Sequence, residues 1–314
     1  MGDKKRHRLL AKSQAKRNAR RIREQYLRGE PYDPGIRHVS DHPIRIGLST
    51  SSVYPMTVTE AFAVAADLGY DGVEVMITGE RETQDVDHIR DMVEHYQLPV
   101  ISLHAPTLLV TPRVLGKNHW RKLLATCEMA KSVGATTVVV HPPFRWQGGY
   151  AHNFEAGVRR VSRGTGVTLA VENMFPWRAG VRELMIYLPH WDPVPQDYDA
   201  VTVDFSHAAT AGADVMDMIR RLGPRLKHIH LTDGAGSVKD EHLVPGRGTM
   251  PVAESLRYLA EHNWDGDVVV EVNTRFAAST AKRDDMLLES LEFAKRHLGI
   301  DETGGTFREA EPGA

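Results

Sequence analysis

Cysteine is nearly absent from this sequence, because Cys127 is the one cysteine among 314 residues. A single cysteine excludes an internal disulfide framework and is typical of a protein in the reducing cytoplasm. No run of about 18 apolar residues is present, so we expect no membrane-spanning helix. The charged start of the chain is not followed by the apolar segment of a secretory signal. We therefore expect a cytoplasmic protein with no membrane partner.

The glycine-rich fingerprints of nucleotide sites are also missing. No predicted strand is followed by Gly-x-Gly-x-x-Gly, which argues against NAD or FAD as a cofactor. The Gly-x-x-x-x-Gly-Lys-Ser/Thr loop that cradles phosphates is absent as well. Any cofactor therefore has to be of another kind.

Charge is distributed unevenly along the chain. The net charge is −2, yet residues 1–30 contain eleven Lys and Arg against Asp3, Glu24 and Glu30. We interpret residues 1–40 as a basic N-terminal extension, partly disordered or helical. It is either a tail that binds nucleic acid or an acidic surface, or a solvated, partly helical extension. The acidic remainder argues against a broad phosphate-binding face on the rest of the protein.

Short β-branched runs alternate with helical stretches from Ile44 onward, which is the pattern of βα units and a parallel sheet. The predicted strands are Arg45–Ser49, Gly72–Met76, Val100–Leu103, Thr136–Val140, Val167–Val171, Ala200–Val203, Leu226–Leu231 and Asp267–Val270. The predicted helices include Thr57–Leu68, Asp85–Tyr96, Trp120–Val133, Asp214–Leu222, Val252–His262 and Arg283–His297. Eight strands in about 255 residues fit a closed barrel better than an open sheet. The sequence therefore predicts one α/β domain, a (β/α)8 TIM barrel over residues 41–300, followed by a flexible tail at 301–314.

Six of the eight predicted strands end in side chains that can bind a metal. They supply His104, His141, Glu172, Asp204 with His207, His230, and Glu271, and the loop after the seventh strand adds Asp240 and His242. A barrel brings its strand ends to one rim, so these imidazoles and carboxylates should converge. Carboxylates buried together need a partner charge, which a divalent cation supplies. The mixed ligands suit zinc, manganese, cobalt or iron better than calcium.

Short motifs at the same strand ends carry a family resemblance. They are Leu-His-Ala-Pro at 103–106, His-Pro at 141–142, Val-Glu-Asn at 171–173, Asp-x-x-His at 204–207, His-Leu-Thr-Asp at 230–233 and Pro-Gly-Arg-Gly at 245–248. In these motifs the chain resembles the xylose isomerase-like barrels over roughly residues 44–298. This group includes sugar isomerases and epimerases and the endonuclease IV class of apurinic endonucleases.

The resemblance implies a set of metal ligands. Glu172, Asp204, His230 and Glu271 correspond to the metal site that the group shares. His104 and His141 correspond to ligands of a second metal in the endonucleases, and His207, Asp240 and His242 to ligands of a third. We therefore expect one to three divalent ions per chain, with manganese, zinc, cobalt or magnesium as candidates.

Two reactions are compatible with this ligand set. The first is isomerisation or epimerisation of a sugar, polyol or sugar phosphate through an enediolate, with Glu172 and Glu271 as the acid–base pair and His207 holding a hydroxyl. The alternative is apurinic/apyrimidinic endonuclease activity in DNA repair. We favour the first, because residues 49–54 lack the Gly-x-His-Val-Ser start of those endonucleases and because Thr78–Asp87 is acidic. A barrel that binds without catalysis is a third hypothesis.

Three further predictions concern residues near the ligand set. Arg247 is the candidate for binding an anionic substrate group, because a guanidinium grips phosphate or carboxylate in a fork. Trp177 is the candidate for a substrate-contacting wall of the pocket, although simple loop packing is an equal alternative for it and its aromatic neighbours. Glu74 lies inside the second strand, where we expect a hydrogen-bonded barrel layer.

Overall fold

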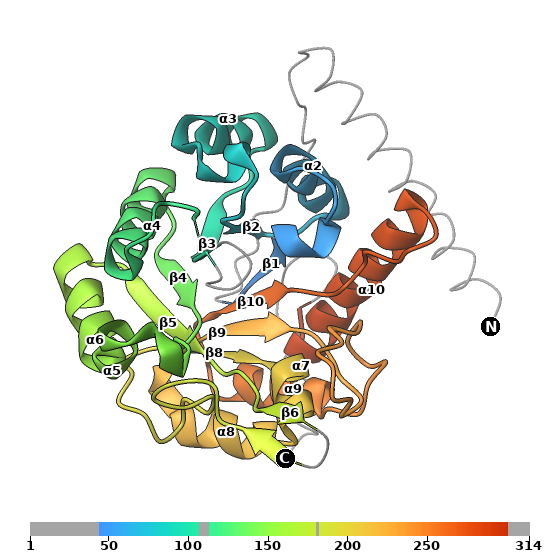
Figure 1. Ribbon diagram of the computed structural model, residues 1–314. Helices are drawn as coiled ribbons and strands as arrows, with labels where there is room; N and C mark the ends of the chain where they lie inside the picture. The colour runs from blue at the N-terminus through green and yellow to red at the C-terminus, as the bar shows by residue number, and fades with distance from the viewer. Residues whose placement is uncertain (1–43, 107–112, 180–181, 301–314) are drawn as a thin grey trace, which may run out of the picture.

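Eight parallel strands close into a barrel in the computed structural model, which describes residues 44–106, 113–179 and 182–300 (Figure 1). They are β1 (Arg45–Ser49), β2 (Gly72–Met76), β3 (Val100–His104), β4 (Thr137–Val140), β5 (Thr168–Glu172), β8 (Val201–Asp204), β9 (Leu226–Leu231) and β10 (Asp267–Val270). The barrel closes where Leu48 of β1 pairs with Val270 of β10 on one side and Val73 of β2 on the other. This arrangement confirms the predicted (β/α)8 TIM barrel, whereas the predicted extension at residues 1–40 and tail at 301–314 lie outside the described residues.

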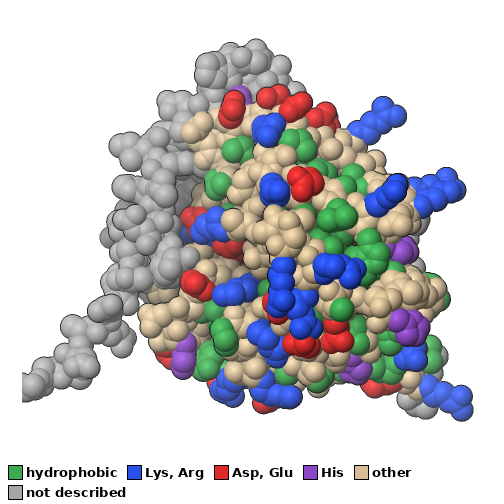
Figure 2. All heavy atoms as spheres, turned by 90° about the vertical axis from the view of Figure 1, so that its left-hand side faces the viewer, with side chains coloured by type: hydrophobic (Ala, Val, Ile, Leu, Met, Phe, Trp, Pro, Cys, Tyr) green, Lys and Arg blue, Asp and Glu red, His purple; other side chains and the backbone are tan. Residues whose placement is uncertain are grey.

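Helices form a ring around these strands (Figure 1). They are α2 (Val58–Leu68), α3 (Val86–Tyr96), α4 (His119–Val133), α5 (Gly149–His152), α6 (Phe154–Thr165), α7 (Phe205–Ala211), α8 (Val215–Leu222), α9 (Val252–Glu261) and α10 (Thr280–Leu298). Short 3-10 turns occupy Thr50–Val53, Arg81–Gln84, Arg145–Gln147 and Gly223–Arg225. On the side of the molecule where α4 and α6 lie, basic and acidic side chains are intermingled (Figure 2).

Several features of the fold were not among the elements predicted from the sequence, including the short helices α5 and α7. Helix α6 buries Phe154, Val158 and Val161, which is a helical spacing within a stretch rich in Arg and Gly. An antiparallel hairpin of β6 (Trp177–Ala179) and β7 (Arg182–Leu184) follows β5. Its strands are too short and too exposed to show an alternating apolar pattern.

The interior of the barrel is apolar except for one polar layer beneath the rim. Glu74, Ser102, Thr202 and His228 are all fully buried there. Strand register sets them side by side, because Glu74 pairs with Ser102 and Thr202 pairs with His228. Such a layer is unusual, since branched apolar residues normally fill the interior of these barrels.

The described part of the chain contains no helix that is both long enough and apolar enough to cross a membrane.

Candidate metal centre

The structure brings all nine predicted ligand residues to the C-terminal rim of the barrel. Strands and the residues that directly follow them supply His104, His141, Glu172, Asp204, His230 and Glu271, helix α7 supplies His207, and the loop between β9 and α9 supplies Asp240 and His242. The candidate ligand atoms of eight of them fall into groups in which all atoms lie within 4.8 Å of one another, and Asp240 contacts two of these eight, His207 and His242. The residues that the sequence singled out therefore form one continuous cluster.

The central group consists of Glu172, Asp204, His230 and Glu271, and all four side chains are buried. His230 Nδ1 lies 2.9 Å from Glu172 Oε1 and 3.0 Å from Glu271 Oε2. Asp204 Oδ2 is 3.8 Å from the same nitrogen. Three carboxylates thus surround one imidazole nitrogen, which is the donor set of a divalent cation site.

Two further groups flank the central one, and a third, formed by Glu74, His228 and His230, lies in the barrel layer beneath it. His141 Nε2 and His104 Nε2 lie 2.9 Å and 3.4 Å from Glu172 Oε2. On the other side, Asp204 is grouped with His207 and His242. Glu172 and Asp204 each belong to two groups, so the donor set would suffice for more than one divalent cation.

Asp240 completes the second flank. Its Oδ2 atom is 3.2 Å from His207 Nε2 and 2.8 Å from His242 Nε2. Its other oxygen, Oδ1, accepts a hydrogen bond from Ser206 Oγ at 2.6 Å. One Asp240 oxygen is therefore fixed, which aims the other at the two imidazoles.

Two carboxylate oxygens in the cluster test whether it fits a cation. Glu172 Oε2 and Asp204 Oδ2 are buried, yet neither accepts a hydrogen bond from any residue that the structure describes. Glu172 Oε2 has only the ion-pair contacts with His141 and His104 described above. A buried carboxylate oxygen that accepts no hydrogen bond is costly. Both residues belong to the groups defined above, so a divalent cation held there would satisfy these oxygens.

The orientation of the histidines fits the same interpretation. In His104, His207 and His242 the Nδ1 atom donates a hydrogen bond to a backbone carbonyl, with distances of 2.9, 2.9 and 2.7 Å to Ala105, Asn173 and Glu271. An Nδ1–H donor leaves Nε2 deprotonated in the neutral ring and available to a metal. In His104 and His242, Nε2 is the atom that faces the carboxylates. In His207, Nε2 faces Asp240 at 3.2 Å, and Nδ1 also lies 3.2 Å from Glu172 Oε1.

His230 has the opposite orientation, and Glu74 accounts for it. His230 Nε2 lies 3.1 Å from Glu74 Oε1, which leaves Nδ1 to the central group. The other Glu74 oxygen is 3.2 Å from His228 Nε2 and accepts a hydrogen bond from Ser102 at 2.8 Å. Glu74 is thus hydrogen-bonded within the barrel layer, as expected, and it also orients a candidate ligand. A glutamate inside an apolar strand was the signal for this role.

Without a cation, protons on the imidazoles balance the carboxylates. Burial alone would raise the pKa of Glu271, but the charge and hydrogen bond of His230 outweigh it and lower that pKa to about 2. Burial alone would lower the pKa of His242, but Asp240 and Asp204 outweigh it and raise that pKa to about 10. Desolvation likewise opposes the rise in the pKa of His230, which the charges of Glu271 and Glu172 bring well above its ordinary value. A bound metal takes the place of such protons.

Backbone hydrogen bonds hold the rim in this shape. Asp204 N donates to Asn173 Oδ1 at 2.7 Å, and Asn173 Nδ2 donates back to the Asp204 carbonyl at 3.1 Å. Asp204 Oδ1 also caps α7 by accepting from His207 N at 2.7 Å. One short motif therefore fixes the relative positions of Asp204 and His207.

The Pro-Gly-Arg-Gly segment positions the loop that carries Asp240 and His242. Asp233 accepts hydrogen bonds from the backbone N–H groups of Gly246, Gly248 and Met250 at 2.8, 3.0 and 3.1 Å. A Cβ atom at Gly248 would lie 2.3 Å from Asp233 Oδ1, so glycine is required for this close approach. The motif is thus a structural clamp within the loop.

Arg247 lies in that segment but faces α10. Its guanidinium forms a two-pronged ion pair with Glu289, at 2.6 and 3.1 Å, and the side chain is half-exposed. An anionic substrate group would have to compete with Glu289 for it.

Trp177 belongs to an aromatic cluster beside the centre. The Phe144 ring stacks on Trp146 and on Tyr187, with centroid distances of 4.6 and 5.0 Å, and the Trp177 ring is 6.1 Å from it. The exposed fraction of Trp177 is 38%, so part of its surface is open to a ligand.

Two residues near the centre were missed from the sequence. Burial raises the pKa of Tyr187 to about 12, and the charges of His207, Glu172 and Asp240 also act on it. Ser51 Oγ donates to Glu271 Oε1 at 2.8 Å. Neither residue lies at a strand end, and their proximity to the ligands depends on loop conformation.

Comparison with known proteins supplies a family and its relatives. The profile of the family described as "Xylose isomerase-like TIM barrel" matches residues 62–297. An uncharacterized protein of Mycobacterium tuberculosis is 47% identical over 274 residues, which are 81% of this chain and 98% of that protein. Fructoselysine 3-epimerase of Escherichia coli O157:H7 is 24% identical over 257 residues, 74% of this chain and 92% of the enzyme. The structure of endonuclease IV from Thermus thermophilus superposes with a TM-score of 0.54 at 22% identity, covering 80% of this chain and 99% of that one.

Proposed function

The chain belongs to the xylose isomerase-like TIM barrel family, and from this premise we propose that it is a metal-dependent isomerase or epimerase of a sugar, a polyol or a sugar phosphate. The observation that carries the proposal is the pair of carboxylates at the central group. Glu172 and Glu271 come from β5 and from the end of β10, yet both lie within 3.0 Å of His230 Nδ1. The similarity to fructoselysine 3-epimerase supports this class of reaction.

The two carboxylates differ in their surroundings, as an acid–base pair requires. Glu271 Oε1 accepts a hydrogen bond from Ser51, whereas Glu172 Oε2 accepts none from the described residues. Different environments separate the proton affinities of paired carboxylates. In this proposal, one glutamate removes a proton from the carbon beside a carbonyl and the other returns a proton to the substrate.

The remaining residues bind and orient the substrate. A divalent cation held by Glu172, Asp204, His230 and Glu271 would polarise adjacent substrate oxygens and stabilise negative charge that develops on them. His207 would hold a hydroxyl through Nε2, which lies 3.2 Å from Asp240 Oδ2 on the flank of the central group. Trp177 and Tyr187 would wall the pocket and exclude water.

Proton exchange with solvent tests this proposal directly. The metal-loaded protein is incubated in D2O with a panel of ketoses, aldoses and their phosphates, and deuterium at the carbon beside the carbonyl is measured by NMR. We expect incorporation that Glu271→Gln abolishes and Glu254→Gln, an exposed change on α9, leaves intact. Equal incorporation in both variants would overturn the acid–base assignment.

Phosphodiester hydrolysis at abasic DNA is the second candidate, and the number of ligands favours it. Nine donors in linked groups exceed what one cation needs, and clustered cations suit phosphodiester cleavage. Against it, Glu80 and Glu82 follow β2 at the same end of the barrel. The basic residues 1–40 lie outside the described residues and support this candidate by sequence charge alone.

Two measurements separate the candidates. Elemental analysis near one metal per chain supports the isomerase, and a value near three zinc ions supports the nuclease. Incision of an abasic duplex by the wild type, lost in Glu172→Gln, would overturn the isomerase proposal. DNA binding that ignores the lesion and weakens steeply with salt would leave it standing, because it reports only the basic extension.

A further inference from the structure

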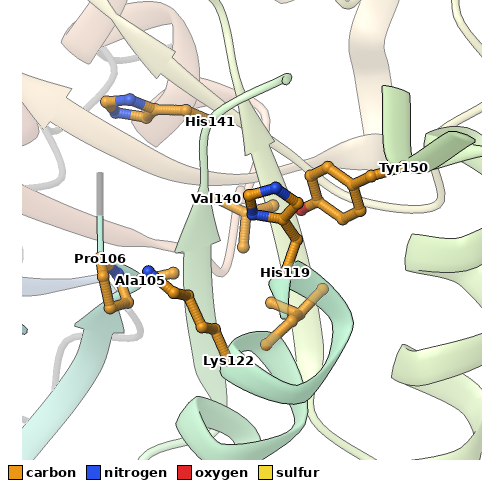
Figure 3. A pocket seen from close by; sticks show the side chains of 8 residues that line it. Ala105, Pro106, His119, Lys122, Val140, His141 and Tyr150 are labelled. Atoms are coloured by element: carbon orange, nitrogen blue, oxygen red, sulfur yellow. The ribbon is translucent and has the colours of Figure 1, made fainter. Parts of the chain in front are cut away.

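A small pocket lies beside the metal centre, on the side of β3 and β4 (Figure 3). His119 and Lys122 project into it from the first turn of α4, and Tyr150 of α5 lies against His119, with ring centroids 4.8 Å apart. His141 lines the pocket and also stands 2.9 Å from Glu172 Oε2. The pocket and the candidate metal centre therefore share one side chain, His141.

Hydrogen bonds outside the pocket fix the tautomer of His119. The backbone N–H of Phe144 donates to Gln147 Oε1 at 2.7 Å, which identifies the other end of that amide as the nitrogen. This Gln147 nitrogen is 3.3 Å from His119 Nε2 and donates to it. In the neutral ring the proton is then on Nδ1, a buried atom without a hydrogen-bond partner among the described residues.

Lys122 adds a positively charged donor to the same pocket. Only 3% of this residue is exposed, although lysine is among the residue types least often buried. An ammonium group offers three donors and no acceptor. Burial lowers the pKa of Lys122, which means that its charged form loses solvation there.

The rest of the pocket reinforces this preference for acceptors. Tyr150 contributes a hydroxyl, and none of the eight described residues that line the pocket is acidic. The positive end of α4, a helix of 15 residues, lies at the same place. Donors, a positive charge and a helix N-terminus together select a ligand group that is anionic and accepts hydrogen bonds.

We infer that the pocket formed by His119, Lys122 and Tyr150 binds the phosphoryl group of a phosphorylated substrate. The inference rests on the proposed function, because His141 adjoins both the pocket and the metal ligands and one small molecule can then reach both. It narrows the substrate class to sugar or polyol phosphates. It also assigns phosphate binding to α4 and α5, on the opposite side of the centre from Arg247.

Binding of inorganic phosphate to the metal-loaded protein tests the inference without requiring turnover. We expect Lys122→Met to raise the Kd for phosphate by at least about tenfold, since a charged hydrogen bond is lost. Lys131→Met is the matched control, because Lys131 lies on the same helix, is half-exposed and pairs with nearby Glu128. The control should stay within about twofold of the wild type. Phosphate that binds only at the metals would give one Kd for all three proteins, and that result would overturn the inference.

A second variant guards against misfolding of Lys122→Met. Tyr150→Phe keeps the ring contacts with His119 and Trp120 and removes only the hydroxyl. We expect about a fivefold higher Kd for phosphate. Phosphate binding that depends on Lys122 and Tyr150, without proton exchange on any sugar phosphate, supports the pocket and refutes the proposed function. Proton exchange on free sugars, together with a Kd for phosphate that neither variant changes, supports the proposed function and refutes the phosphate pocket.

The phosphate of a nucleic acid is the alternative ligand that the experiment must distinguish from a small phosphorylated substrate. Inorganic phosphate should compete with a sugar phosphate for this pocket. If the protein bound an oligonucleotide duplex, weakened by Lys122→Met, and bound no inorganic phosphate, the assignment to a small phosphorylated substrate would be wrong.

Discussion

The rim of the barrel and the polar layer beneath it use the same residue types in different ways. Both contain buried glutamate and histidine side chains. In the layer, each Glu74 oxygen accepts a hydrogen bond, Oε1 from His230 and Oε2 from Ser102. At the rim, one oxygen each of Glu172 and Asp204 accepts no hydrogen bond from the described residues. The residue type is the same in both regions. A carboxylate oxygen that accepts no hydrogen bond therefore distinguishes a candidate metal ligand from a structural carboxylate.

His230 joins the two regions. Its Nε2 atom belongs to the layer through Glu74, and its Nδ1 atom belongs to the rim through Glu172 and Glu271. A carboxylate behind a ligating histidine fixes the ring and raises its basicity. The layer thus orients a candidate ligand of the rim. We therefore expect variants at the rim to remove metal ligands, and variants in the layer to weaken metal binding indirectly.

The largest effect is expected from Glu172→Gln. This residue belongs to two of the ligand groups, so its loss should remove metal from both. We expect activity to fall by at least about a thousandfold and metal content to drop, while the fold is retained. Elemental analysis, circular dichroism and the deuterium-exchange assay check this outcome. Normal metal content in Glu172→Gln would show that its open oxygen is no ligand.

Metal removal should have an effect on stability that grows with pH. In the metal-free protein, the pKa of His242 is raised to about 10, and the pKa values of His207 and His230 are also raised. Groups with a raised pKa stabilise the fold fully below about pH 6.5, and this stability is lost as pH rises toward 10. Metal binding strengthens over the same range because the imidazoles must be deprotonated.

The difference in Tm between metal-loaded and chelated protein should therefore widen from pH 6.5 to pH 9, to on the order of 10 °C. Scanning calorimetry with and without EDTA measures it. A difference that stays constant or narrows would mean that protons and metal do not exchange at these imidazoles.

A smaller effect is expected one layer down, from Glu74→Gln. The amide cannot accept from His230 and His228 as a carboxylate does, so the His230 ring loses its fixed orientation and part of its basicity. We expect metal affinity to fall by about 10- to 100-fold. Competition with a chromophoric chelator measures this, and rescue by Glu74→Asp is not expected because the shorter side chain cannot reach both histidines. A loss as complete as in Glu172→Gln would place Glu74 among the ligands themselves.

The residues at the strand ends can be predicted from the sequence, whereas the contacts that orient them cannot. His104, Glu172, Asp204 and Glu271 could be predicted because each ends an apolar run, and a barrel gathers such ends at one rim. The orientation of the histidine rings could not be predicted, because it depends on the backbone carbonyl to which each Nδ1 donates a hydrogen bond. The ion pair between Arg247 and Glu289 spans 42 residues and leaves no local pattern.

The same limit applies to the pocket at α4. Lys122 and His119 read as residues of an ordinary amphipathic helix, and only packing shows that Lys122 is buried beside His141. The tautomer of His119 depends on Gln147 and Phe144, which lie in a separate loop. Tertiary contacts between segments about 30 residues apart thus decide a function that periodicity cannot reveal.

The smallest effect is expected from Ser102→Ala, which removes one of the hydrogen bonds to Glu74. Glu74 Oε2 keeps His228 Nε2 at 3.2 Å, and Oε1 keeps His230. Since the carboxylate remains partnered, we expect a loss of only about 1 kcal/mol in the free energy of unfolding and metal affinity within about threefold of the wild type. Urea unfolding and the same chelator competition provide the two measurements. If metal affinity fell as far as in Glu74→Gln, the layer would be part of the ligand system, and the contrast between satisfied and open carboxylates would no longer separate structure from function.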